Sequence, residues 1–123
     1  MSGMATSETR DLIASDKVAG TSVYDRNANK LGSVSNLMLD KRSGQVAYAV
    51  LSFGGFLGMG SSYHPLPWNQ LHYDPNVGGY VVDLTKEQLE AAPTYAAPNE
   101  AQWDDPAYGR GIDDYYTSVG GRR

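Results

Sequence analysis

The sequence lacks cysteine altogether and has only two histidines among its 123 residues. Without cysteine the chain cannot form disulfides, thiolate metal sites or a cysteine nucleophile. Charged residues are also sparse, at 20% of the chain, and apolar residues reach only 41%. These fractions are slightly low for a compact globular domain, which indicates that part of the chain is peripheral to the core.

An excess of basic charge is missing too. The chain has 14 acidic residues against 10 basic ones, for a formal net charge of −4. Because nucleic-acid binding needs clustered cations, this balance argues against a nucleic-acid-coating surface, although it allows one small basic patch. Long apolar runs are absent as well: residues 1–15 have no signal-peptide core, and no window approaches a membrane span. We therefore expect a cytoplasmic protein without direct membrane insertion.

The most informative stretch is residues 45–68, QVAYAVLSFGGFLGMGSSYHPLPW. It opens with a strand, ending at Phe53, that is apolar on both faces. Since side chains alternate between the faces of a strand, such a strand should be covered on both. A glycine-rich loop then reverses the chain, and Pro65 and Pro67 bracket its return. A small barrel has only one inside, so either the C-terminal segment or a second subunit must cover the other face.

The rest of the chain reads as short strands at roughly ten-residue spacing, which is typical of a small antiparallel barrel or sandwich. A tight turn at residues 41–44 places Gly44 where a positive φ is needed. Thr85 and Gln88 form a capping box that starts a short helix over residues 86–92, and Pro93 ends it. The strands are predicted at residues 22–25, 31–40, 46–53, 61–65, 67–73 and 80–83. The residues expected in packed apolar clusters are Leu37, Leu39, Val50, Leu51, Phe53, Trp68 and Leu71.

The patterns for phosphate and metal binding are incomplete. Residues 55–62, GFLGMGSS, nearly fit a phosphate-binding loop, but Ser61 stands where a lysine must reach the phosphates. His64 and His72 are the only imidazoles, and His72 shares a predicted strand face with Asp74. A metal site usually needs three or four protein ligands, so this set falls short. We predict no cofactor and no metal site.

The patterns for catalysis are incomplete in the same way. No order of serine, histidine and aspartate resembles a triad, and no nucleophile elbow is present. The acidic pairs at residues 104–105 and 113–114 are adjacent in sequence, so their side chains point in different directions on any regular element. We predict no catalytic residue and no enzyme activity.

Taken together, the hairpin, the GGFLGMG loop and the following proline–tryptophan pair resemble the PRC-barrel domain, over residues 16–95. That domain is shared by the cytoplasmic part of the photosynthetic reaction-centre H subunit and by a ribosome maturation factor. The sequence departs from the family pattern at Ala28 and Asn29, where the first turn more often carries a glycine, which leaves the geometry of that turn open. The matching segments are residues 23–25, 31–32, 39–40, 44–58, 67–68, 71, 79–80 and 89–93.

The resemblance implies a mainly β fold: a small antiparallel PRC-type barrel with one short helix and an aromatic-containing C-terminal extension. The expected organisation is a flexible N-terminal segment at residues 1–15, the barrel at 16–95 and the extension at 96–123. The family also implies a protein-interaction or adaptor module that commonly self-associates. Two alternatives stay open: an RNA- or ribosome-linked assembly factor, and a small-ligand or proton-handling module associated with an electron-transfer complex.

The apolar and aromatic side chains of the loop and the extension exceed what one small barrel can hide. We therefore expect a homodimer or a higher even oligomer, together with an unidentified partner protein. The competing arrangement folds the extension back onto its own barrel. The residues expected to make the contact are Phe56, Leu57 and Met59 in the glycine loop, and Trp103, Tyr108, Tyr115 and Tyr116 in the extension.

Overall fold

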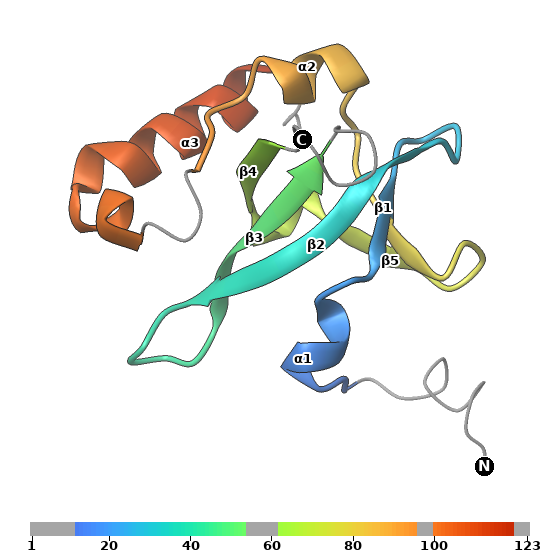
Figure 1. Cartoon of the computed structure of the whole chain (residues 1–123), viewed down its shortest axis with the longest axis horizontal. Helices are drawn as coiled ribbons and strands as arrows, with labels where there is room; N and C mark the ends of the chain where they lie inside the picture. Colours follow the sequence, from blue (N-terminus) through green and yellow to red (C-terminus); the bar gives the residue numbers. More distant parts are fainter. Residues whose placement is uncertain (1–11, 54–61, 96–99, 120–123) are drawn as a thin grey trace.

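The computed structural model describes residues 12–53, 62–95 and 100–119 (Figure 1). The fold is mainly β, with one six-stranded sheet and a few helices. The elements in chain order are α1 (Ser15–Val18), β1 (Ser22–Tyr24), β2 (Lys30–Leu39), β3 (Val46–Phe53), β4 (Ser62–Pro67), η2 (Trp68–Gln70), β5 (His72–Asp74), β6 (Gly79–Val81), α2 (Lys86–Glu90), η3 (Glu100–Asp104) and α3 (Pro106–Val119).

The strands pair in the order β4-β3-β2-β1-β6-β5. Four of these pairs are antiparallel, as predicted, but β1 and β6 run parallel. The expectation of an entirely antiparallel sheet is therefore wrong at this pair. Parallel strands need a long crossover connection, and the intervening hairpins provide it. Closure of the sheet into a barrel stays a prediction.

One proline, Pro65, falls inside a strand instead of ending it. β4 runs through Pro65 and ends at Pro67. It is the last strand in the sheet order, where a missing backbone N–H leaves no ladder bond unmade. The predicted strand over residues 67–73 is wrong, because the chain first forms the one-turn helix η2, closed by the Leu71 N–H to the Trp68 carbonyl at 3.1 Å. Of the predicted strand, only the last two residues form part of β5.

Local hydrogen bonds hold the predicted turns. Asp25 Oδ1 accepts bonds from the amides of Asn27 and Asn29, at 2.8 and 2.9 Å. Gly44 has a φ of +78°, as the sequence predicted. Ala28 also has a positive φ, +67°, in the turn where the family pattern more often has a glycine. A residue with a Cβ pays about 1–2 kcal/mol for that conformation.

The capping box at the start of α2 is confirmed. Thr85 Oγ1 accepts from the Gln88 amide at 3.0 Å, and Gln88 Oε1 accepts from the Thr85 amide at 2.9 Å. The helix spans only Lys86–Glu90, slightly shorter than predicted. Its Leu89 is fully buried. A helix this short is not stable alone, so it depends on this packing against the sheet.

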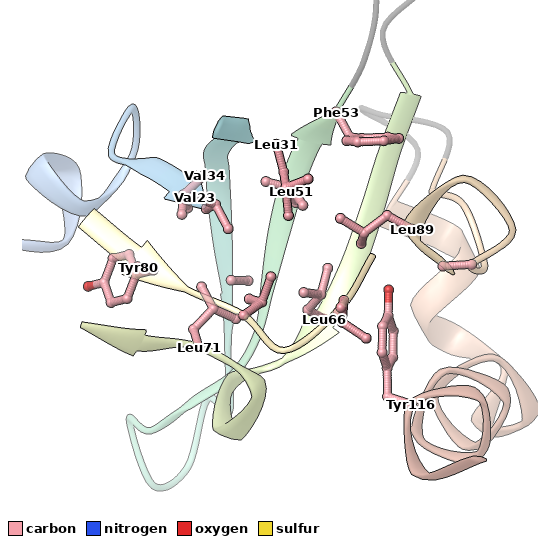
Figure 2. Close-up of a cluster of buried hydrophobic side chains, with 14 of the residues drawn as sticks. Val23, Leu31, Val34, Leu51, Phe53, Leu66, Leu71, Tyr80, Leu89 and Tyr116 are labelled. Atoms are coloured by element: carbon pink, nitrogen blue, oxygen red, sulfur yellow. The ribbon is translucent and has the colours of Figure 1, made fainter. Parts of the chain in front are cut away.

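The core lies inside the curve of the sheet, and α2 and α3 add Leu89, Ile112 and Tyr116 to it from one side (Figure 2). Leu37 and Trp68 are only partly buried and pack against this core. The prediction that Leu39 is buried is wrong: it is 50% exposed, at the hairpin end of β2 beside a register irregularity. The buried cluster comprises Val18, Val23, Leu31, Val34, Ala49, Leu51, Phe53, Leu66, Leu71, Tyr80, Val82, Leu84, Leu89, Ala92, Ile112 and Tyr116.

Candidate interaction surface

The C-terminal extension is helical, which the sequence analysis missed. Pro106 takes the first position of α3, where a missing N–H costs nothing. Asp105 Oδ1 accepts a bond from the Ala107 amide at 2.9 Å and so satisfies one of the free donors at the helix start. The signal was present as apolar residues on one helical face. These are Tyr108, Ile112, Tyr116 and Val119.

This helix packs on the sheet of its own chain. α3 lies against β4, on the same side of the molecule as α2 (Figure 1). Ile112 and Tyr116 are 0% and 1% exposed and belong to the core cluster. Figure 2 shows Tyr116 reaching from α3 into that cluster near Leu66. The extension therefore folds back onto its own chain, which was the alternative to a dimer contact.

A cluster of four aromatic rings joins the extension to β3. Trp103 lies at its centre, with ring centroids 5.0 Å from Tyr48, 5.9 Å from Tyr95 and 4.9 Å from Tyr108. Tyr48 and Val50 share one face of β3, since they alternate with residues of the core face. At Tyr48, then, the extension of the same chain covers the second face of the strand.

Hydrogen bonds add to this packing. The Tyr48 hydroxyl donates to Asp113 Oδ1 at 3.1 Å. Tyr115 donates its hydroxyl proton to the Gln88 carbonyl, and Gln88 Nε2 donates to the Val119 carbonyl at 3.3 Å. The middle of α3 is thus tied to β3 through Asp113, and its C-terminal part is tied to α2 through Tyr115 and Val119.

Two polar atoms of the extension are buried without compensation. Trp103 Nε1 and the Tyr116 hydroxyl have no hydrogen-bond partner within the described residues. Burial also raises the pKa of Tyr116, because the phenolate would lose its hydration. An unsatisfied buried polar group costs about 1–3 kcal/mol. The extension is therefore held less tightly than its buried area implies.

The residues predicted to make intermolecular contacts have different positions. Trp103, Tyr108 and Tyr115 are partly buried against the core cluster, and the Tyr108 hydroxyl donates to the Thr94 carbonyl at 2.7 Å. Tyr116 is buried, so it is inaccessible to another molecule while α3 is in place. A role for these residues in an interface stays a prediction. Those that lie outside the described residues are Phe56, Leu57 and Met59.

The residues that hold the extension in place were not predicted from the sequence. Tyr48 and Ile112 were not singled out, although both are central to the contact. The sequence signal that could have indicated Tyr48 was its place on a strand that is apolar on both faces. The signal for Ile112 was its helical spacing to Tyr116, which the neighbouring glycines and prolines obscured.

The two histidines occupy unlike places. His64 is buried on β4: its Nδ1–H donates to the Pro93 carbonyl at 3.2 Å, and its Nε2 lies 2.8 Å from Ser62 Oγ. Burial lowers the pKa of His64. His72 is exposed on β5. Within the described part of the chain, no three His, Cys, Asp or Glu side chains come together as metal ligands. The position of His64 is that of a packing residue.

Polar side chains line two of the grooves on the described part of the surface. One, of about 550 Å³, lies between the β1–β2 turn and the start of α2, beside an ion pair of Arg26 with Asp83 at 3.3 Å. The other, of about 580 Å³, lies between η2, β5 and α3, where His72 and Asp113 line it. Both are open and are lined largely by polar side chains, unlike the mostly apolar sites that bury small ligands.

A comparison with protein-family models matches residues 10–89 to the PRC-barrel domain. None of the curated proteins compared matches the chain. The matched segment runs from before α1 to Leu89 in α2, so η3 and α3 follow it in the chain. Among the helices of the described residues, none is long and apolar enough to cross a membrane.

Proposed function

This chain belongs to the PRC-barrel domain family, and we propose that it is a cytoplasmic, non-enzymatic protein-interaction module that self-associates and docks a partner protein. PRC-barrel domains are generally non-catalytic. The observation that carries the proposal is the aromatic cluster around Trp103. The sheet already holds a helical segment there through ring contacts and a hydroxyl, and such a surface suits the recognition of helices.

The charge of the chain supports a protein partner over a nucleic acid. The net charge is −4, whereas a phosphate-binding surface needs clustered lysine and arginine. Two alternatives rest on the family relation alone: an RNA- or ribosome-linked assembly factor, and a small-ligand or proton-handling module associated with an electron-transfer complex. A pull-down at physiological salt separates them: a stoichiometric protein partner supports the adaptor, and co-purifying RNA supports the assembly factor.

Light scattering at tens of micromolar tests self-association. We expect the mass of a dimer or of a higher even oligomer. The contact is assigned to the glycine loop, so replacing Phe56, Leu57 and Met59 together by serine should give a monomer. Leu39→Ser is the control, because Leu39 is apolar, is 50% exposed and is distant in sequence from the loop. A monomeric full chain would refute the self-association.

A further inference from the structure

We propose that η3 and α3, residues 100–119, form a displaceable cover over a helix-docking surface, and that the partner is an amphipathic helix of matching pattern. This assignment rests on the proposed function, since it names the surface and the kind of partner of the interaction module. The docking surface is defined by the residues that the cover contacts on β3, β4 and α2. These are Tyr48, Leu66, Gln88 and Leu89.

The contacts of the cover specify the pattern that a partner helix needs. Ile112 and Tyr116, four residues apart, enter the core cluster from one face of α3. Asp113, next to the first of them, accepts the hydrogen bond of the Tyr48 hydroxyl at 3.1 Å. A docking helix would therefore carry large apolar residues at positions i and i+4 and a carboxylate at i+1. Helix-in-groove recognition uses anchors at this spacing.

The cover is an imperfect occupant of this surface. Both buried polar atoms without a partner in the described residues, Trp103 Nε1 and the Tyr116 hydroxyl, belong to the cover. A helix with leucine or phenylalanine in place of Tyr116 would dock without leaving that hydroxyl unsatisfied. Removing the cover would expose apolar surface that a better-fitting helix could bury again.

A glycine in α3 weakens the cover further. A Cβ on Gly111 would meet nothing within 4 Å, so glycine is not required there and only lowers helix stability. Gly109 differs, because a Cβ there would lie 3.3 Å from the Tyr48 hydroxyl. Packing therefore does not require the helix-weakening glycine at position 111. Its presence is consistent with a cover that can be displaced.

A second copy of the chain is a poorer occupant than a foreign helix. Its tail has the same sequence and so makes the same contacts as the resident cover. The resident cover competes at an effective concentration in the millimolar range, because it is tethered. An identical tail has no extra binding free energy to offset that advantage. A foreign helix that lacks the two unsatisfied polar atoms does have such a gain.

The test is a fluorescence titration with a labelled peptide of residues 100–119 carrying Gly111→Ala and Tyr116→Phe. It is measured against the natural full-length chain and three full-length variants. In the first, Ile112→Ala loosens the cover, and we expect the peptide to bind about tenfold more tightly than to the natural chain. In the second, Gly111→Ala with Tyr116→Phe tightens the cover, and binding should weaken about fivefold or more. In the third, Ile13→Ala changes an exposed isoleucine and should leave binding unchanged.

The outcomes separate this assignment from the proposed function. Equal affinity for all chains, or no binding to any chain that circular dichroism shows to be folded, overturns the displaceable cover. If Ile112→Ala does not fold, the tightened chain still decides. Light scattering on the same samples reports self-association independently: a dimer that ignores the peptide refutes only the cover, and a monomer that binds it refutes only self-association. If the Ile112→Ala chain, without peptide, dimerises more readily than the natural chain, the occupant of the docking surface is a second copy of the chain. That result would refute the proposal of a foreign helix.

Discussion

The hydroxyl of Tyr48 on β3 donates a hydrogen bond to Asp113 on α3 over 3.1 Å, although the two residues lie 65 positions apart. The Gly109 carbonyl is 3.5 Å from the same hydroxyl. Burial and the bond to Asp113 raise the pKa of Tyr48 to about 12. The phenol therefore stays protonated at physiological pH and remains a donor. This contact ties the C-terminal helix to the strand around which the chain is organised.

Removing this tie should weaken the docking of α3 without disturbing the sheet. Tyr48→Phe keeps the ring against Trp103 and deletes the donor, so the free energy of unfolding should fall by about 0.5–1.5 kcal/mol. The measurement is urea unfolding of Tyr48→Phe, Asp113→Ala and the double variant. If the two effects simply add, the hydrogen bond contributes nothing. Asp114→Ala, an exposed neighbour, serves as control and should change little.

Truncation of the core should be costly at Leu51 and harmless at Leu39. Leu51 is 2% exposed on β3, so Leu51→Ala should lower the free energy of unfolding by about 2–5 kcal/mol. Leu39→Ala makes the same chemical change on an exposed side chain and should cost less than about 0.5 kcal/mol. Chemical denaturation measures both. Similar losses for the two variants would mean that the core is misplaced.

Two glycines should respond in opposite directions to alanine. A Cβ on Gly32 would overlap the Ser52 carbonyl of the paired strand, so Gly32→Ala should destabilise the fold by about 1–3 kcal/mol. Gly111→Ala meets open space in a helix and should stabilise it by about 0.5–1 kcal/mol. Thermal and urea unfolding report both changes. A tolerated Gly32→Ala would contradict the close approach of β2 to β3.

Stability should decline as the pH falls through the range in which histidine titrates. Burial lowers the pKa of His64 below its ordinary value of 6.5, so the unfolded chain takes up the proton at a higher pH than the folded one. Its contribution is complete above the unfolded pKa and is lost as the pH drops below it. We expect a slope of at most about 1.4 kcal/mol per pH unit between about pH 7 and pH 5.

The pH effect can be assigned to one histidine. His72→Asn removes the exposed imidazole and should leave the slope unchanged, whereas His64→Gln should flatten it. Asp25 and Asp40 also contribute to acid sensitivity, because backbone hydrogen bonds lower the pKa of each. Their effect appears only below the ordinary aspartate value of 3.8, outside this window. A slope that disappears with His72→Asn would refute the assignment to His64.

Features that depend on a few neighbouring residues were predictable. The capping box of Thr85 and Gln88 and the positive φ of Gly44 appear as expected, because each is decided by local hydrogen bonds or sterics. The family was also recognisable, and the matched residues 10–89 confirm it. The predicted end of a strand at Pro65 was wrong, because the position of that strand in the sheet matters more than the local sequence. β4 is an edge strand, which tolerates a proline in its interior.

The sequence by itself determined that β3 needs cover on both faces, since its alternating apolar residues leave no solvent face. Which segment provides that cover was decided only by the tertiary structure. Residues 106–119 contain two glycines and begin with proline, so local propensity does not favour a helix. Packing of Ile112 and Tyr116 against β4 and α2 supplies the stability that the segment lacks alone. Long-range burial is invisible to local pattern, and it selected the chain's own C-terminal helix.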